Sequence, residues 1–304
     1  MDPERHFWLQ FSDAEAGLRL DRALALRLPQ FSRTALQGWL REGRVTLDDL
    51  PVAATRQVKG GERLWLDLPE PVLSDIQAEE IPLTIIFEDD TVLVIDKPAG
   101  LVVHPGAGCR QGTMQNALLY HAPDLAVLPR SGIVHRLDKD TSGLLVIART
   151  EIARLALIEQ LKTREMGREY EALVVGTPPP QGFIEAAIGR DPRHRTRMAV
   201  TAHGRPARTE YELIERLGRF SLLRVRLKTG RTHQIRVHMT HIGFPLVGDA
   251  VYGRAKTRDI LPRQALHARR LSLIHPKSGE RLTFECPMAG DFVDALQRLR
   301  KEAV

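Results

Sequence analysis

The residues best placed to do chemistry lie in the sequence IVHRLDKDTSGLLVIAR, which runs from Ile133 to Arg149. Two apolar segments flank a polar turn that contains Asp138 and Asp140. If the segment is a simple hairpin, both carboxylates make local turn hydrogen bonds, which suits Asp140 because Thr-Ser-Gly follows it. Asp138 comes earlier, and Arg136 two residues before it would share a strand face with it and could pair with it. Chain position alone leaves both a structural and a catalytic role open for Asp138.

A second stretch, KTGRTHQIRVHMTHIG from Lys228 to Gly243, places basic and apolar side chains at helical spacing. Its buried stripe would consist of Ile235, Met239 and Ile242. Arg236 would lie on another face of the helix, together with His233. Three histidines in one stretch are compatible with a metal site, but no HExxH pattern, cysteine or neighbouring carboxylate accompanies them. The sequence therefore predicts no metal site here.

Two further features are an aromatic residue and a cluster of arginines. Tyr170, one of four tyrosines, opens a predicted strand just after a basic segment, where core packing is the default interpretation. Residues 189–208 contain six arginines and one acidic residue. Because such a run repels itself, binding to phosphate groups is the favoured explanation, and an exposed solvated loop is the alternative.

Charge is distributed unevenly along the 304 residues, although the formal net charge is only +6. Residues 70–90 carry seven acidic and no basic side chains, and residues 91–304 hold an excess of 13 positive charges. This segregation favours a nucleic-acid partner over a merely solvated surface. No apolar run approaches the length of a membrane span, the N-terminus has no signal-peptide core, and the two cysteines match no disulfide or metal spacing. We therefore expect a cytoplasmic protein without membrane association.

The elements that must position these residues fall into two units, separated by a break in composition. The small unit spans residues 17–69, and the large unit spans residues 83–304. Residues 1–16 are expected to form an N-terminal tail, and the acidic, proline-containing residues 70–82 are expected to form a linker. A monomer is expected, because no long apolar heptad or exposed apolar stretch is visible.

Hydrophobic periodicity predicts the elements inside each unit. In the small unit, helices are expected at residues 20–28 and 32–42, and strands at 44–47 and 63–68. In the large unit, helices are expected at residues 151–166, 235–242 and 292–302, and strands at 83–88, 92–96, 132–137, 144–149, 170–175 and 220–228. Strands that are close in sequence, with helices spaced irregularly, favour an α+β fold with a central mixed, mainly antiparallel sheet flanked by helices and loops.

Several strings, taken together and in this order, resemble the ribosomal large-subunit pseudouridine synthase family. HRLDKDTSGLLV resembles the catalytic motif of that family, and GRTHQIRVHM resembles its basic motif. Further matching strings are DKPAGLVVHPGAG from Asp96, REYEALVVG from Arg168, PLVGDAVYG from Pro245 and RQALHARRLSLIHP from Arg263. The likeness runs from about residue 17 to the C-terminus, and the small unit resembles an S4-type α/β RNA-binding domain.

The resemblance implies an RNA pseudouridine synthase, which breaks the N1–C1′ bond of uridine, rotates the base and rejoins it through C5. It assigns the catalytic carboxylate to Asp138 and its positive partner, which would keep the carboxyl group ionised, to Arg236. It assigns base stacking, with help in proton transfer from C5, to Tyr170. Whether the carboxylate attacks C1′ or removes the C2′ proton to give a glycal stays open. The reaction needs no cofactor and no metal.

The same resemblance implies how the RNA is held. Ile235, Arg136 and His135 are expected at the substrate, and Arg136 is expected to reach into the RNA or toward the carboxylate. The target base must leave its stack, at a cost of a few kcal/mol that an aromatic face partly offsets. Phosphate contacts are expected from arginines of both units: Arg33, Arg41, Arg44, Arg193, Arg195 and Arg197.

The implied partner is 23S rRNA or a precursor of the large ribosomal subunit, and the flanking strings favour a stem-loop at the subunit interface. Other 23S rRNA sites and tRNA are the alternative substrates. Two other classes of function are a non-catalytic RNA-binding or ribosome-assembly factor, and a hydrolase that uses Asp138 and Asp140 as a metal-binding or acid–base pair. The combination of Asp138, Tyr170 and Arg236 favours the synthase over the non-catalytic factor, and activity that survives strong chelation would count against a metal-dependent hydrolase.

Overall fold

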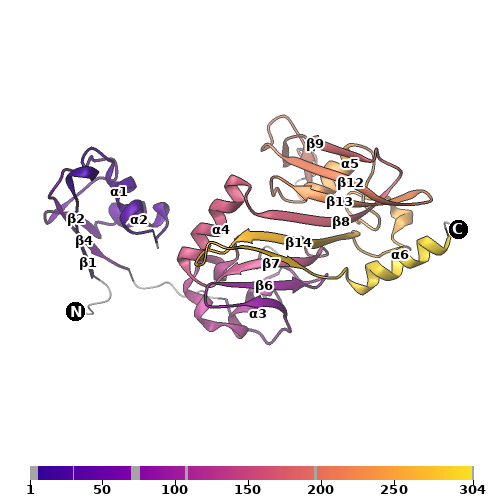
Figure 1. Ribbon diagram of the computed structural model, residues 1–304, viewed down its shortest axis with the longest axis horizontal. Coiled ribbons are helices and arrows are strands. Elements are labelled where there is room, and N and C mark those ends of the chain that lie inside the picture. Colours follow the sequence, from indigo (N-terminus) through magenta and orange to yellow (C-terminus); the bar gives the residue numbers. More distant parts are fainter. Residues whose placement is uncertain (1–5, 30, 70–75, 107–108, 195–196, 303–304) are drawn as a thin grey trace. The chain divides into compact units, whose positions relative to one another are not determined.

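A computed structural model describes residues 6–29, 31–69, 76–106, 109–194 and 197–302 of the chain (Figure 1). The chain divides into two compact units, Met1–Leu73 and Ser74–Val304. Each unit has a hydrophobic core of its own. Among the described residues, no helix is both long and apolar enough to cross a membrane.

The smaller unit packs two helices, α1 (Leu20–Arg27) and α2 (Arg33–Arg41), on a four-stranded sheet. The strand order is β1-β4-β2-β3, with bounds His6–Gln10, Arg63–Asp67, Val45–Leu47 and Leu50–Pro51, and a 3-10 helix, η1, spans Asp13–Glu15. The predicted helices and the strands β2 and β4 are thereby confirmed. Ser32 caps α2 by accepting a hydrogen bond from the backbone N–H of Ala35 at 3.2 Å, which explains why the helix begins there.

The segment expected to be an N-terminal tail belongs to this unit from residue 6 onward. β1 pairs antiparallel with β4 along its whole length, and Phe7 and Leu9 alternate toward the core. Phe11 is 1% exposed. The tail predicted for residues 1–16 was therefore wrong for residues 6–16, because the alternation of a five-residue strand is too short to stand out within a charged segment.

The larger unit is built on a nine-stranded sheet of order β5-β6-β7-β14-β8-β13-β12-β9, with β15 paired to β14 (Figure 1). The strands are β5 (Thr84–Glu88), β6 (Val92–Lys97), β7 (Ser142–Ala148), β8 (Gly167–Val175), β9 (Gln181–Glu185), β12 (Arg208–Leu217), β13 (Phe220–Leu227), β14 (Leu266–Ile274) and β15 (Arg281–Glu285). All neighbours pair antiparallel except β14 and β7, which are parallel. The predicted α+β fold with a mixed, mainly antiparallel sheet is confirmed.

Helices pack on this sheet from both sides. They are α3 (Met114–His121), α4 (Glu151–Thr163), α5 (Gln234–His241) and α6 (Gly290–Glu302), with the 3-10 turns η2 (Pro123–Val127), η3 (Pro129–Gly132) and η4 (Ala255–Thr257) and a small hairpin of β10 (Ile188–Arg190) and β11 (Met198–Val200). The predicted helices α4, α5 and α6 are confirmed to within a few residues. β7 is buried at every position because its side chains alternate between two cores. Leu145 and Ile147 pack with α3, whereas Leu144 and Val146 pack with α4.

The strand predicted over residues 132–137 is not formed, and the prediction was wrong. Gly132 (φ +75°) packs so closely on β7 that a β-carbon there would lie 1.9 Å from a backbone oxygen of that strand, and beyond it Ile133 forms only an isolated bridge. Apolar composition does not distinguish a strand from a loop that crosses over one. Arg136 and Asp138 therefore do not share a strand face, and these two described residues form no ion pair with each other.

The predicted linker also needs correction. Residues 76–82 are attached to the larger unit: Ile76 packs on its core, and the side-chain amide of Asn116 donates to the carbonyl of Gln77 at 2.8 Å. The carboxylate of Glu79 accepts the N–H of Gly112 at 3.0 Å. Residues 70–75 lie outside the described residues. The linker prediction over 70–82 was therefore wrong for the described residues 76–82, where the backbone bonds to α3 and the Glu79 side chain bonds to the loop before it.

Candidate active site

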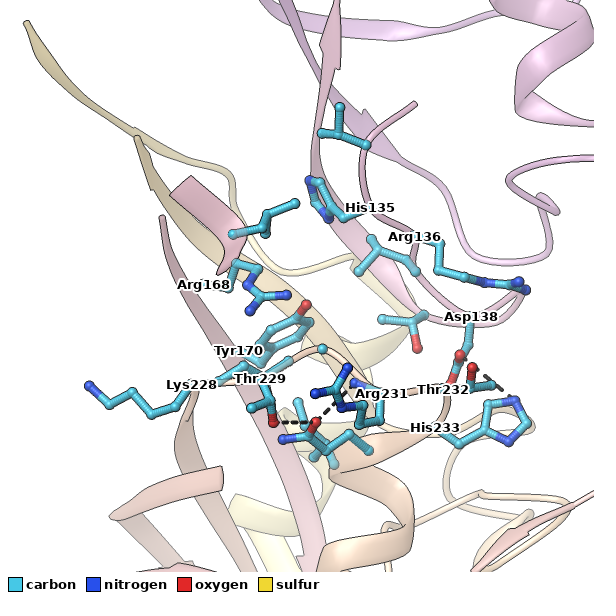
Figure 2. Close-up of a pocket in the computed structure, with 18 of the residues that line it drawn as sticks. His135, Arg136, Asp138, Arg168, Tyr170, Lys228, Thr229, Arg231, Thr232 and His233 are labelled. Carbon is cyan, nitrogen blue, oxygen red and sulfur yellow. Dashed lines mark hydrogen bonds and ion pairs between the residues drawn. The ribbon is translucent and has the colours of Figure 1, made fainter. Parts of the chain in front are cut away.

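A cavity of about 610 Å³ is lined by the loop before β7, the start of β8 and the loop before α5. Its lining brings together all six residues expected at the catalytic centre: Asp138, Tyr170, Arg236, Arg136, Ile235 and His135. Figure 2 shows Arg168 and Tyr170 on one side of the view, and Asp138 and His233 on the other. Asp138 is the only acidic residue of the described lining, which also contains eight lysines and arginines. The cavity therefore suits a polyanionic substrate that meets a single carboxylate.

The turn that carries Asp138 is fixed through its backbone. The carbonyl of Asp138 accepts the N–H of Thr141 at 3.1 Å, and the carbonyl of Lys139 accepts a hydrogen bond from Nζ of Lys97 at 2.9 Å. Lys97 is fully buried at the end of β6, and burial lowers the pKa of its ammonium group to about 8. Its other two hydrogen bonds go to backbone carbonyls of its own loop. The buried lysine thus ties the end of β6 to the turn and restricts the position of Asp138.

Arg236 is held between two carboxylates. It donates from Nη1 to Oδ2 of Asp138 at 3.0 Å, and from Nε and Nη2 to the two oxygens of Asp249 at 2.7 and 2.9 Å. The side chain of Arg236 is 6% exposed, that of Asp249 is 0% exposed and that of Asp138 is 15% exposed. Asp249 therefore holds the guanidinium from the interior, and Asp138 is the carboxylate that faces the cavity.

Burial and charge act against each other in this cluster. Burial alone would lower the pKa of Arg236, but the hydrogen bonds and charges of Asp249 and Asp138 outweigh it and raise that pKa above its usual value. Burial alone would raise the pKa of Asp249, but the Arg236 guanidinium and two backbone N–H groups lower it. The buried pair is therefore ionised, and a permanent positive charge stays beside the carboxylate of Asp138.

Tyr170 and Ile235 contribute the apolar surfaces of the cavity, and they are 5% and 3% exposed. Burial raises the pKa of Tyr170, the negative charge of Asp138 acts in the same direction, and the positive charge of Arg168 opposes it. The phenol is therefore protonated at neutral pH and can donate a hydrogen bond. Its ring and the side chain of Ile235 offer the cavity a surface on which a flat base can rest.

The two predicted substrate contacts next to Asp138 have different surroundings. Nε2 of His135 accepts a hydrogen bond from the N–H of Val146 at 3.2 Å, and burial lowers the pKa of this imidazole to about 3. His135 is therefore a neutral ring tied to β7. Arg136 is exposed and donates from Nη1 to Nε2 of His104 at 3.4 Å. Of the two, Arg136 has the charge that is accessible from solvent.

Three residues around Asp138 and Arg236 were not predicted: His233, Asp249 and Tyr252. Nε2 of His233 lies 3.8 Å from Oδ1 of Asp138, and Nδ1 lies 2.9 Å from the hydroxyl of Tyr252. His233 appeared in the sequence only as a neighbour of Arg236 on a helix. Asp249 and Tyr252 lie in the string PLVGDAVYG, to which no role was attached. Their distance from Asp138 along the chain left no spacing signal.

The arginines expected to contact phosphate in the smaller unit have unequal surroundings. Arg33 donates from Nη2 to the buried carboxylate of Asp21 at 2.8 Å, yet its own side chain is 54% exposed. Arg41 is exposed and donates to a backbone carbonyl one helical turn earlier. Arg44 pairs with two acidic side chains, Glu42 and Asp67. Arg33 and Arg41 are therefore better placed than Arg44 to meet a phosphate.

The arginine-rich stretch folds into the β10–β11 hairpin and its connecting loop. Asp191 shapes the loop by accepting the backbone N–H groups of Arg193 and His194 at 2.8 and 3.3 Å. Arg193 and Arg197 are exposed there, whereas Arg195 lies outside the described residues. The carboxylate of Asp191, the single acidic residue of this stretch, is thus bonded to backbone N–H groups of the loop.

The histidines around α5 do not converge on one point. Nδ1 of His238 lies 2.9 Å from Oγ1 of Thr209, and its Nε2 lies 2.9 Å from the carbonyl of Ala186, whereas His233 faces the cavity. Within the described part of the chain, no group of three or more His, Cys, Asp or Glu residues could hold a metal ion.

Known proteins resemble this chain over almost its whole length. A model of the RNA pseudouridylate synthase family matches residues 91–241. The chain is 52% identical over 300 residues to the ribosomal large subunit pseudouridine synthase D of Nitrosomonas europaea, which covers 96% of this chain and 87% of that protein. It is 47% identical over 298 residues to the protein of the same name from Pseudomonas aeruginosa. This alignment covers 94% of this chain and 93% of the Pseudomonas protein.

A solved structure agrees with these matches. The human RNA pseudouridylate synthase domain containing 1 is similar with a TM-score of 0.55 and 27% identity, over 73% of this chain and 96% of that chain. The similarity in sequence and the similarity in fold therefore lead to the same conclusion: the chain belongs to the RNA pseudouridylate synthase family, isomerases that convert uridine in RNA to pseudouridine.

Proposed function

We propose that this enzyme modifies uridines in the RNA of the large ribosomal subunit, 23S rRNA, and that Asp138 is its catalytic carboxylate. One observation carries the assignment of Asp138: it is the only acidic side chain in the described lining of a strongly cationic cavity, with Arg236 buried behind it. A carboxylate in that position meets the ribose of a bound nucleotide, while the surrounding cations meet phosphates.

The reaction balances without a co-reactant. Asp138 acts on the ribose, by attack on C1′ or by removal of the C2′ proton, and the N1–C1′ bond breaks. The base turns and C5 bonds to C1′, while the C1′–Asp138 bond breaks or, in the glycal route, the proton returns to C2′. The proton on C5 is then released and N1 takes up a proton, so that the product is an isomer of the uridine. Arg236 supplies the counter-charge to Asp138 throughout, and Asp249 keeps Arg236 in place.

Tyr170, Ile235, Arg136 and His135 serve the flipped base in this proposal. Tyr170 stacks with the base, and its hydroxyl takes part in moving the C5 proton. Ile235 packs against the base from the α5 side, and His135 completes the wall of the cavity. Arg136, which is exposed, enters the space that the base leaves in the RNA, so that the cost of unstacking, a few kcal/mol, is partly offset.

The smaller unit is proposed to be an S4-type RNA-binding domain. Its two helices on a small sheet, with Arg33 and Arg41 exposed on α2, support this proposal. Arg193 and Arg197 would extend the phosphate contacts in the larger unit, and Arg44 would contribute least because two acids already pair with it. Arg195 is proposed from the sequence alone.

The substrate is the least constrained part of the proposal. The names of the relatives refer to the large ribosomal subunit, and we extend that substrate to this chain, with the stem-loop at the subunit interface as the favoured site. The enzyme would then act in the cytoplasm, where ribosomes are assembled. Action as a monomer and without a cofactor is part of the same proposal.

Mapping pseudouridines in 23S rRNA tests this proposal. RNA would be taken from cells that lack the protein, and from the same cells supplied with the wild type or with Asp138→Asn. We expect specific sites to be lost on deletion and restored by the wild type only. If every 23S rRNA site persisted in the deletion, the ribosomal substrate would be wrong; if Asp138→Asn restored the sites, the catalytic role of Asp138 would be wrong.

A further inference from the structure

His233 lies near the oxygen of the Asp138 carboxylate that Arg236 does not contact. Its Nε2 lies 3.8 Å from Oδ1 of Asp138, whereas Arg236 donates to Oδ2 of the same carboxylate. Arg236 and His233 therefore lie beside different oxygens of Asp138. Figure 2 shows His233 and Asp138 joined by a dashed line. The side chain of His233 is 22% exposed, against 6% for Arg236, so His233 borders the space that a substrate would enter.

The backbone of His233 is in a conformation that few side chains adopt. Its φ and ψ angles are +57° and +22°, in the left-handed region, directly before α5. Residues other than glycine, asparagine, aspartate and histidine rarely adopt it, and the cost is about 1–2 kcal/mol. The carbonyl of His233 accepts the N–H of Val237 at 2.9 Å, and contacts of the ring add to this.

The contact that holds the ring comes from Tyr252. The hydroxyl oxygen of Tyr252 accepts the backbone N–H of Met198 at 2.8 Å and lies 2.9 Å from Nδ1 of His233. The hydroxyl hydrogen is then free to be donated, and among the described residues the structure offers it no acceptor other than Nδ1. A neutral ring whose Nδ1 accepts a hydrogen bond carries its proton on Nε2, the nitrogen that faces Asp138.

The ring is neutral under ordinary conditions. Burial is the largest influence and lowers the pKa of His233; the positive charges of Arg236 and Arg136 act in the same direction, against the carboxylates of Asp138 and Asp249. The Nε2–H group can therefore donate a hydrogen bond without adding a second full positive charge beside Arg236.

We propose that His233, fixed by Tyr252 with its proton on Nε2, is a positioning residue that donates a second hydrogen bond to Asp138 when substrate is bound. The inference rests on the proposed catalytic role of Asp138. The 3.8 Å separation shortens on substrate binding, as catalytic hydrogen bonds often do. With Arg236 on one oxygen and His233 on the other, the carboxylate plane is fixed against the ribose.

The same contacts connect Asp138 to the arginine-bearing hairpin. Met198 belongs to β11, whose preceding loop carries Arg193 and Arg197. A path of direct contacts therefore runs from the backbone of β11 through Tyr252 and His233 to Asp138.

A double-mutant cycle tests the inference, with single-turnover rates and RNA affinity measured for each variant. Tyr252→Phe removes only the hydroxyl and keeps the ring, whose centroid lies 5.0 Å from the Arg236 guanidinium carbon. His233→Asn tolerates the left-handed backbone but is too short to bridge Tyr252 and Asp138. Tyr120→Phe makes the same chemical change at an exposed tyrosine and is the matched control.

We expect Tyr252→Phe and His233→Asn each to lower the single-turnover rate about tenfold, with RNA affinity within about twofold of the wild type. Because Tyr252 acts through His233, the double variant should be no slower than His233→Asn alone. Nitrogen NMR of histidine-labelled enzyme should show the Nε2–H form of His233 in the wild type and a mixture of the two neutral forms in Tyr252→Phe.

Any of three results would overturn the inference. The rate losses of the two single variants could multiply in the double variant, Tyr252→Phe could keep the wild-type rate, or its histidine spectrum could be unchanged. The proposed function fails separately: it is wrong if Asp138→Asn is active, whatever the outcome of the cycle. Thermal unfolding of all variants against Tyr120→Phe identifies a variant that has simply lost its fold. If Tyr252→Phe is such a variant, the rate of His233→Asn and the wild-type histidine spectrum carry the test, and an Nδ1–H form of His233 in the wild type would overturn the inference.

Discussion

Two carboxylate–arginine clusters in this chain are built with opposite orientations. In the smaller unit, Asp21 is 0% exposed and accepts hydrogen bonds from Arg19 and Arg33, whose side chains are 50% and 54% exposed. In the larger unit, Arg236 is buried and Asp138 faces the cavity. Burial thus decides which partner a ligand can reach: cations that suit phosphate in the first cluster, and a carboxylate that suits ribose in the second.

The comparison also predicts how much stability is lost when one partner of a charge cluster is removed. Removing one partner leaves an uncompensated charge in a poor solvent when the remaining partner is buried, and a charge that water can solvate when the remaining partner is exposed. Asp249 pairs with the buried Arg236, Asp21 pairs with the half-exposed Arg19 and Arg33, and Arg41 is itself exposed. These residues provide tests of the comparison, taken here from the largest expected effect to the smallest.

Asp249→Asn should have the largest effect. The variant leaves the buried guanidinium of Arg236 without its interior counter-charge, so we expect a loss of about 3–5 kcal/mol in unfolding free energy. Because Arg236 would then shift relative to Asp138, the single-turnover rate should fall about a hundredfold. Denaturant unfolding and tritium release from C5-labelled RNA measure the two effects. Glu215→Gln, which removes a surface carboxylate bonded to Arg300, should change neither, and equal losses in both variants would contradict the comparison.

Asp21→Asn should destabilise the smaller unit by about 2–3 kcal/mol and leave the chemistry of bound RNA unchanged. Burial would raise the pKa of Asp21, but hydrogen bonds from Arg19, Arg33 and Gln37 outweigh it and hold that pKa below its usual range. A lowered folded-state pKa stabilises above the unfolded value, about 3.9, and the stabilisation is lost as the pH falls through the folded value.

Thermal unfolding at pH 7 and between pH 5 and 2.5 measures this dependence. The wild-type smaller unit should lose stability as the pH falls below about 4, and the Asp21→Asn variant should show a smaller decline over that window. A decline of equal size in both proteins would contradict the assigned role of Asp21.

Arg41→Ala should have the smallest effect, because its charge is already solvated. We expect RNA affinity to fall a few-fold, the slope of log affinity against log salt to decrease by about one, and the single-turnover rate on saturating RNA to stay unchanged. Arg300→Ala, which removes a surface arginine of α6 paired with Glu215, is the matched control and should keep the wild-type slope. If the slope of log affinity against log salt in Arg41→Ala equalled that of the wild type, α2 would not be part of the proposed RNA contact.

Periodic elements were predictable because their signals are local. The capping residue Ser32 and the apolar spacing of α2 fixed that helix before its structure was known. By contrast, β1 is too short to show its alternation, and the segment around Gly132 has the composition of a strand but is held as a loop by close packing on β7. The structures of these two segments depend on contacts with β4 and β7, which the local sequence does not reveal.

The same limit applies to the site. Asp138, Tyr170 and Arg236 lie in strings that resemble a family pattern, and the structure brings them into one cavity. Asp249, Tyr252 and His233 were missed because their importance comes from contacts with one another and with Asp138, which no spacing along the chain reveals. The ion pair considered between Arg136 and Asp138 rested on a strand that does not form, and Arg236 takes that place.

The central claim is that the carboxylate of Asp138 performs the chemistry. The most direct test is tritium release from C5-labelled target RNA under single-turnover conditions, with Asp138→Asn compared with Asp140→Asn, a change of the same kind two residues later. We expect Asp138→Asn to bind RNA as tightly as the wild type and to release no tritium above background, and Asp140→Asn to retain activity. Release by Asp138→Asn at the wild-type rate would contradict the account.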